Sequence, residues 1–280
     1  MLIELAVGDA YGAGFEYADP EFVKAHNTLG GYVQHPHHRG VLPGRYTDDT
    51  QMTLAIAEQL VSGEPWTGRA LAERFVRGYH RDPRDGYAGR FHQLLSDVGD
   101  GAELLARIRP DSDKSGAAMR AAPLGLLPTV PEVLRHTEIQ ARITHDTPAG
   151  VGAAQAAALA VHYCHFGLGP VSSVGQWIAR VLPDGGWDRP WQGKVGPKGW
   201  MSVRAALTAL AGHDSLSAML RACVAYTGDV DTVATIALAA ASRAPSITQD
   251  LPAVLLDGLE TGPYGQSYLR DLDTRLLALS

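Results

Sequence analysis

Apolar residues recur at every third or fourth position along most of this chain, a spacing that places them on one face of an α-helix. The recurrence predicts helices over residues 66–79, 91–98, 129–144 and 268–279. Runs in which β-branched or aromatic residues alternate with polar ones, the usual sign of strands, are scarce. The pattern therefore predicts an all-α fold.

The start of the chain shows the same helical pattern over residues 1–16, and we expect this helix to end near Gly14. It passes through a stretch of small residues between Gly8 and Gly12, where a second backbone could approach closely. At the other end, the helical tail over 268–279 is expected to pack against the rest of the fold.

Two polar segments interrupt the helical pattern. Residues 30–44 form a long segment that contains His35, His37 and His38, which we expect to be solvated side chains of a surface loop. Residues 81–89 are charged and contain glycine, so they predict a surface turn between two helices.

The composition is that of an ordinary globular protein. Hydrophobic residues make up 45% of the 280 residues and charged residues 19%. Because no Ser-, Pro- or Gly-rich linker divides the sequence, we expect a single compact domain over residues 1–280. Cys164 and Cys223 lie in apolar helical patterns, which favours buried free thiols, a reducing interior and a cytoplasmic location.

The charge of the chain excludes some partners. A net charge of −6 and a pI near 6.0 argue against broad electrostatic binding of nucleic acid or of an anionic membrane. The first residues lack the basic region of a signal peptide, and the most apolar internal stretch, 153–161, is too short to span a bilayer. We therefore expect no membrane partner.

Two similar acidic clusters lie far apart in the sequence. The first, Thr47-Asp48-Asp49-Thr50, comes immediately before the apolar helical run 51–60. The second, Gly228-Asp229-Val230-Asp231-Thr232, comes immediately before the apolar run 233–241. Each cluster therefore sits where a helix is expected to begin.

Helix capping is the simpler explanation of each cluster, because Asp and Thr satisfy the free N–H groups of a first helical turn. One cap needs one such residue, however, and each cluster offers two carboxylates that repel unless a cation or proton neutralises them. If the two helix starts meet, their oxygens would form a site that selects Mg²⁺ or Mn²⁺, with Ca²⁺ also compatible, over Zn²⁺. Four carboxylates are enough for two divalent ions.

Five ordered segments of the chain together resemble the ADP-ribosylglycohydrolase family. The two acidic clusters are joined by three further stretches in the same order and spacing: Gly8 to Glu16, Gly116 to Arg120, and Ile143 to His145. The resemblance spans nearly the whole chain. It implies the family's all-α, multi-helix domain.

The resemblance also implies an activity, which is hydrolysis of the glycosidic bond of an ADP-ribosyl adduct with release of ADP-ribose. The adduct could be on a protein side chain, a nucleic acid base or a small molecule. Two divalent cations, Mg²⁺ or Mn²⁺, would be held at the matching positions, Thr47, Asp48, Asp49, Asp229, Asp231 and Thr232. The implied catalytic groups are Asp48, Asp229 and Glu16, which matches the acidic residue that ends the family's first segment and would act as acid/base or gate.

By the same resemblance, five residues would contact the substrate, namely Ser115, Gly116, Met119, His145 and Trp200. Segment 111–120 would lie against the pyrophosphate. From the residues alone, a helix start with small side chains offers free N–H groups to phosphate oxygens, and a plain helix capped by Ser115 is the alternative. His145, at a helix junction, suits either substrate contact or a structural hydrogen bond.

The chain departs from the family pattern at two of these places. Lys114-Ser115 stand where the family usually has Gly-Asn, and Trp200 stands where it commonly has Tyr. Trp200 ends the segment 183–200, which is rich in Pro, Gly and Trp and predicts a loop. Its aromatic rings could stack on a base or ribose, or could simply hold the loop against the core.

Other classes of protein remain open on this sequence. A helical prenyl-diphosphate enzyme would space its carboxylates one turn apart, and Asp48-Asp49 lacks that second member. An all-α metal-dependent phosphohydrolase would use His145-Asp146 together with further His ligands on other helices. A non-enzymatic alternative is an ADP-ribose-binding module that keeps the pocket without turnover.

Overall fold

The structure, a computed structural model, describes residues 1–279 as α-helices and short 3₁₀ turns joined by loops. Within these residues, β-type backbone pairing is confined to four isolated bridges. The predicted all-α fold is therefore confirmed. In the same range, no helix is both long and apolar enough to cross a membrane.

The α-helices of the described chain are α1 (Leu2–Ala13), α2 (Pro20–His26), α3 (Asp48–Ser62), α4 (Gly68–Arg81), α5 (Gly89–Asp97), α6 (Gly101–Arg107), α7 (Gly116–Met119), α8 (Val130–Arg142), α9 (Pro148–His165), α10 (Val174–Val181), α11 (Gly199–Gly212), α12 (Leu216–Ala225), α13 (Val230–Ala241), α14 (Ala253–Gly258) and α15 (Gln266–Leu277). The 3₁₀ turns are η1 (Ala122–Leu126), η2 (Val171–Ser173) and η3 (Pro183–Gly185).

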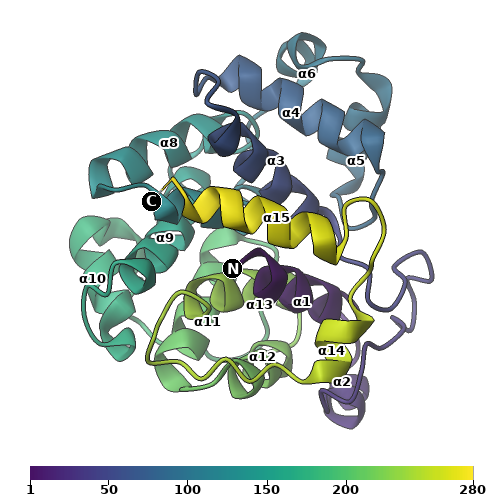
Figure 1. Cartoon of the computed structure of the whole chain (residues 1–280), viewed down its shortest axis with the longest axis vertical. Helices are drawn as coiled ribbons and strands as arrows, with labels where there is room; N and C mark the ends of the chain where they lie inside the picture. Colours follow the sequence, from purple (N-terminus) through teal and green to yellow (C-terminus); the bar gives the residue numbers. More distant parts are fainter. Residues whose placement is uncertain (280) are drawn as a thin grey trace.

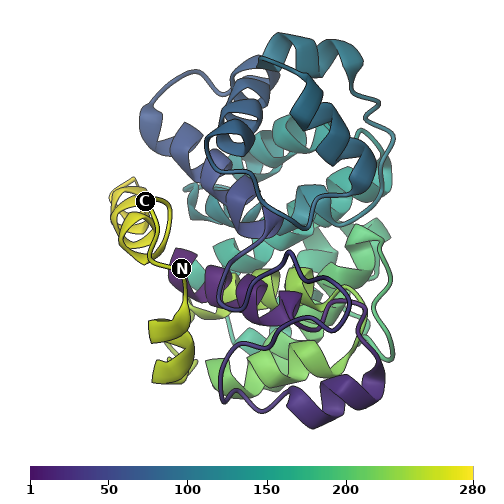
Figure 2. The same cartoon turned by 90° about the vertical axis from the view of Figure 1, so that its right-hand side faces the viewer.

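Helices α1 and α13 pack side by side at the centre of the molecule (Figure 1). Every residue of α13 is buried, and so is every residue of α1 except Glu4. A helix that is apolar on all sides belongs in the interior of a protein. Figure 2 shows α1 running between an upper group of helices that includes α3 to α6 and a lower group that includes α2 and α12.

The close packing of α1 on α13 depends on the small residues predicted for this purpose. A Cβ atom added to Gly12 would lie 2.4 Å from the Cα of Asp231, which is far inside van der Waals contact. The absence of a side chain at Gly12 therefore lets α1 reach the first turn of α13, where the second acidic cluster lies.

Two smaller predictions are also confirmed. The tail helix α15 packs against α1 and α3, and its Leu269, Leu272 and Leu276 are buried. Cys164 and Cys223 are free thiols, and both are buried.

The prediction of a solvated histidine trio is wrong for His35, which is 2% exposed. Both of its ring nitrogens have hydrogen-bond partners on the backbone, so the ring is buried without an unsatisfied polar atom. His37 and His38 are exposed, as predicted.

The prediction of a surface turn over 81–89 is confirmed for most of the segment, which joins α4 to α5 and is largely exposed, but two of its side chains are buried. Arg84 is 6% exposed, and its guanidinium lies over the ring of Tyr46, 3.9 Å from the ring centroid, while it pairs with Asp82 and Glu260. Tyr87 is also buried, and its hydroxyl donates to Gln51 Oε1 over 2.8 Å. The side chains of Arg84 and Tyr87 turn inward because they find partners on neighbouring elements.

Candidate active site

Six carboxyl side chains converge where α1 ends and where α3 and α13 begin. They are Asp9 and Glu16 from the first segment, Asp48 and Asp49 from the first acidic turn, and Asp229 and Asp231 from the second. The four aspartates of the two turns are only 3–8% exposed. Carboxyl oxygens of Glu16, Asp229 and Asp231 all lie within 4.8 Å of one another. The two acidic clusters therefore share one buried site.

The first turn is held by Asp9, which projects from α1. Its two oxygens accept hydrogen bonds from the backbone N–H groups of Thr47 and Thr50 over 2.9–3.1 Å. They also accept from both threonine hydroxyls, over 2.7 and 2.6 Å. Asp9 thus caps α3 from another helix, so Asp48 and Asp49 are not needed as caps.

The second turn is held mainly by its backbone. Thr227 and Gly228 have φ of 62° and 91°, in the left-handed region. Val195 brackets the turn, because its N–H donates to the carbonyl of Thr227 over 2.9 Å and its carbonyl accepts from Asp229 N–H over 3.2 Å. The hydroxyl of Ser202 donates to Asp229 Oδ2 over 2.7 Å. Asp229 stands at the N-cap of α13 without a side-chain cap bond, so its carboxylate is not used as a helix cap.

Burial raises the pKa of all six carboxyl groups in this site, and repulsion between them adds to the rise at four of the groups. Burial is the larger cause for Asp48, Asp49 and Asp231, and the charges of neighbouring carboxylates raise the pKa of each further, well above its usual value. Burial, followed by the charges of Asp229 and Asp9, raises the pKa of Glu16 to about 7. Without a counter-charge, the site would hold protons near neutral pH.

The described residues do not supply that counter-charge, because none of the six carboxylates takes part in an ion pair within residues 1–279. Two buried oxygens, Asp49 Oδ2 and Asp231 Oδ1, also lack a hydrogen-bond partner. One comes from each turn. Buried oxygens without partners, in an all-oxygen set, fit a hard divalent cation such as Mg²⁺ or Mn²⁺.

The threonines of the two clusters suit the same interpretation. Thr47 is buried and gives its hydroxyl proton to Asp9, so the remaining lone pairs of its oxygen are free to face a cation. Thr232 is buried too, and its hydroxyl lowers the pKa of Asp49 by hydrogen bonding across from the other turn.

Backbone contacts bring the predicted substrate segment to this site. Lys114 forms an isolated bridge with Lys198, and Val195 forms one with Gly228 of the second turn. Hydrogen bonds from Ser202 and Ser115 act on Asp229 and partly offset the rise in its pKa that burial causes. Ser115 therefore lies beside the acidic site rather than acting as a helix cap, and its side chain makes no cap bond to α7.

His145 lies next to Gly116, at the end of a buried hydrogen-bond chain. Arg120 donates to the Thr144 hydroxyl over 2.8 Å, and that hydroxyl lies 2.6 Å from Nδ1 of His145. Because a guanidinium only donates, the Thr144 proton is free to go to Nδ1, which places the ring proton on Nε2. Burial, followed by the charge of Arg120, lowers the pKa of His145 to about 3.

The Nε2 atom of His145 is buried and has no partner. It lies 3.3 Å from the position that a Cβ of Gly116 would occupy. His145 therefore presents a neutral N–H donor toward Gly116. In the described chain it is not part of any group of three side chains placed to hold a metal, so the arrangement gives no support to a phosphohydrolase that uses His145-Asp146.

Met119 and Trp200 lie in different surroundings. Met119 is 5% exposed and packs in the core, and its carbonyl accepts from Thr53 over 3.3 Å. Trp200 is half-buried and lines a groove between the start of α9 and residues 182–187. Ligand contact by these two residues stays a prediction.

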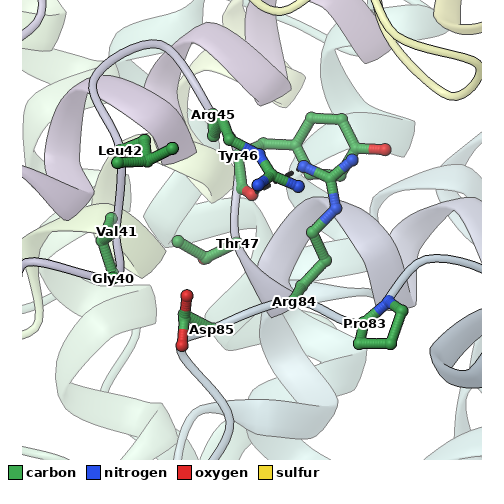
Figure 3. Close-up of a pocket in the computed structure, with 9 residues that line it drawn as sticks. All are labelled: Gly40, Val41, Leu42, Arg45, Tyr46, Thr47, Pro83, Arg84 and Asp85. Carbon is green, nitrogen blue, oxygen red and sulfur yellow. Dashed lines mark hydrogen bonds between the residues drawn. The ribbon is translucent and has the colours of Figure 1, made fainter.

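A small cavity lies beside the first acidic turn (Figure 3). Its walls are the loop residues Gly40 to Leu42 and the segment Pro83 to Asp85, and Thr47 lies at its edge. The carbonyl of Asp85 accepts the backbone N–H of Asp48 over 3.1 Å. Segment 83–85 therefore borders the first acidic turn, and residues 40–42 line the same cavity.

Sequence reasoning assigned no role to Asp9, Ser202 or His35. A role for Asp9 could have been predicted, because this residue lies inside the first segment of the family resemblance. Ser202 and His35 gave no comparable signal, since each acts on a residue distant in the sequence.

Comparison with known proteins shows the family of this chain. A profile of the ADP-ribosylglycohydrolase family matches residues 1–280. This chain therefore belongs to the ADP-ribosylglycohydrolase family. A solved structure described as "ADP-ribosylglycohydrolase-related protein complex" superposes with a TM-score of 0.72 at 25% identity, covering 99% of this chain and 94% of that one.

Two curated relatives show how far the likeness extends. The chain is 31% identical over 145 residues to "ADP-ribosylhydrolase ARH3" of Xenopus tropicalis, covering 49% of this chain and 41% of that protein. It is 24% identical over 171 residues to "ADP-ribosylarginine hydrolase Tri1" of Serratia proteamaculans, covering 58% and 45%. Each match thus spans less than half the length of the relative.

Proposed function

We propose that this protein hydrolyses the glycosidic bond between ADP-ribose and an acceptor group and releases ADP-ribose. The observation that carries the proposal is a cluster of six carboxyl groups, five buried and Glu16 half-buried, that has no cationic side-chain partner within residues 1–279. It is assembled from both ends of a chain of this family. Such a cluster is costly to bury unless it binds cations, and a family member has a use for them in holding a ribose.

The residues proposed to hold two divalent cations, Mg²⁺ or Mn²⁺, are Thr47, Asp48, Asp49, Asp229, Asp231 and Thr232. The buried oxygens without partners on Asp49 and Asp231 support this assignment, as does the absence of ion pairs to the four aspartates among residues 1–279. When bound, divalent cations fix hydroxyl groups and lower the pKa of coordinated water.

Glu16 is proposed to serve as the acid/base of the reaction. Departure of the acceptor builds positive charge on the ribose ring, so the site needs a base to activate water and an acid to protonate the leaving atom. A carboxyl group whose pKa is raised to about 7 can hold or give up a proton at neutral pH. Asp48 and Asp229 are proposed to orient water and ribose beside it.

The ligand's diphosphate is proposed to lie along segment 111–120. Ser115 and Gly116 lie beside the carboxylates, and His145 Nε2–H supplies a neutral donor for an oxygen of the ligand. A cytoplasmic location also stays a prediction, resting on the two free, buried thiols.

The test is to incubate the protein, with Mg²⁺ or Mn²⁺, with ADP-ribosylated arginine, serine, nucleic acid and O-acetyl substrates and to measure released ADP-ribose. We expect release from at least one of them, and its loss when the cation is chelated. Tight binding of ADP-ribose without release from any substrate would instead indicate a binding module.

A further inference from the structure

His35 forms a buried junction between the loop 27–47 and the end of α1. Its Nε2 atom lies 2.8 Å from the carbonyl oxygen of Glu16. Its Nδ1 atom accepts the backbone N–H groups of His37 and His38 over 3.1 and 2.9 Å. One ring thus connects the fold of the loop with the backbone of the proposed acid/base.

These contacts fix the protonation of the ring. Backbone N–H groups only donate, so Nδ1 must be unprotonated and Nε2 must carry the proton that it donates to Glu16. Burial lowers the pKa of His35, which favours the same neutral form. The neighbouring His37 and His38 are exposed, and no ring contact of theirs to Glu16 is present in the described structure.

The backbone around Glu16 is held from two directions. The next residue, Tyr17, has φ of 51°, a left-handed value that is uncommon outside glycine, and its N–H donates to Gly228 of the second acidic turn over 2.8 Å. His35 binds the carbonyl of Glu16 on the other side. Both contacts fall on the Glu16–Tyr17 peptide unit, and carboxyl oxygens of Glu16, Asp229 and Asp231 lie within 4.8 Å of one another.

The loop 27–47 is also packed closely against the end of α1. A Cβ atom on Gly14 would lie 2.4 Å from the carbonyl oxygen of Val33, so loop and helix end are in direct backbone contact. Movement of the loop near His35 would therefore be passed to the backbone that carries Glu16.

We infer that His35 is a positioning residue that holds the backbone of Glu16, and with it the Glu16 carboxyl group, in place against Asp229 and Asp231. The inference rests on the proposed function only through the role given to Glu16. Held backbone geometry matters here because a displacement of about 1 Å at a reacting group can cost about 100-fold in rate.

Two substitutions separate the two functions of the ring. In His35→Gln the side-chain amide can reach the Nε2 position and donate to Glu16, whereas in His35→Asn the shorter amide can accept from the loop N–H groups but does not reach Glu16. We expect His35→Gln to keep kcat within about threefold of wild type. We expect His35→Asn to lower kcat by about tenfold or more with little change in KM, because the group displaced acts on the reaction rather than on binding.

His37→Ala and His38→Ala are the matched controls, and both should keep wild-type kcat. A His35→Asn variant as active as wild type, or a His35→Gln variant as impaired as His35→Asn, would overturn the inference, because the ring would then act only within the loop. On wild-type protein, ¹⁵N spectra of His35 add an independent test, since a proton on Nδ1 would contradict it.

Crystal structures of the two variants distinguish this inference from the proposed function. Glu16 should stay beside Asp229 and Asp231 in His35→Gln and move away in His35→Asn, whatever the substrate. A wild-type protein that releases no ADP-ribose would end the proposed function, while an unmoved Glu16 in His35→Asn would end the inference about His35.

Discussion

The two acidic turns of this protein have nearly the same sequence but are held in different ways. In the turn at 47–50, one side chain from another helix, Asp9, satisfies both the backbone N–H groups and the hydroxyls. In the turn at 227–232, left-handed backbone at Thr227 and Gly228 and the bracketing strand-like contact of Val195 set the shape.

This difference predicts which substitutions would disrupt each turn. The first turn depends on a single carboxylate, that of Asp9, whose oxygens are occupied by hydrogen bonds within the turn. The second turn depends on backbone geometry, and the hydrogen bond from Ser202 contributes less. In both turns other groups satisfy the first backbone N–H groups, so the acidic side chains are not needed as helix caps.

The largest expected effect comes from removing one buried, unpartnered carboxylate in either turn. Asp49→Asn and Asp231→Asn should each lower ADP-ribose release by about 100-fold or more, since a loss in the metal's own ligands should exceed the 10–100-fold that supporting residues usually cost. The measurement is the initial rate at saturating Mg²⁺. Asp271→Asn, on the exposed face of α15, is the control; full activity in either site variant would mean that the turns do not share one site.

Asp9→Asn should disrupt the fold of the first acidic turn and leave that of the second unchanged. An amide cannot accept all the bonds that Asp9 accepts, so we expect activity to fall by about 10–100-fold, with a loss of about 1–2 kcal/mol in the free energy of unfolding from the lost cap. Enzyme assays and denaturant unfolding check these two effects. Asp271→Asn is again the control, and equal rates for Asp9→Asn and wild type would contradict a positioning role.

Cation affinity should rise with pH. Glu16, with its pKa raised from 4.5 to about 7, and the aspartates beside it hold protons that a cation must displace. Each proton released strengthens apparent binding by up to about tenfold per pH unit while pH is below the raised pKa, and this gain ends above it. Calorimetry of Mg²⁺ binding from about pH 5.5 to 7.5, in buffers of different ionisation enthalpy, measures both effects; affinity independent of pH would argue against displaced protons.

Ser202→Ala should have the smallest effect, because Val195 still brackets the second turn. Loss of one hydrogen bond to a carboxylate costs about 1.5–3 kcal/mol when the bond is buried and irreplaceable, and about 0.5–1.5 kcal/mol in the ordinary case. We expect the ordinary case and a rate loss of about tenfold at most. A loss as large as that of Asp9→Asn would show that the second turn also depends on a single side chain.

The sequence was sufficient to predict the helices and the acidic pair because both are local. Helical periodicity over α4, α8 and α15 follows from residues three or four apart, and each acidic cluster is contiguous. The structure then confirmed buried Cys164 and Cys223 in helices of that kind.

What the sequence could not predict depends on distant partners. A buried histidine in a polar loop is tolerated at position 35 only because the Glu16 carbonyl and two loop N–H groups meet its ring. Arg84 lies in a charged segment but is buried, because its guanidinium pairs with Glu260 and stacks over the ring of Tyr46. Such partners are far apart in the sequence, so no local pattern predicts these contacts.

The most direct test of a shared, cation-holding site is calorimetric titration of Mn²⁺ into the wild-type protein and into Asp49→Asn and Asp231→Asn. We expect two ions per wild-type chain and weakened binding in both variants, although the two substitutions lie in opposite ends of the sequence. Wild-type protein that binds no Mn²⁺, or a variant that binds it as wild type does, would contradict the proposed site.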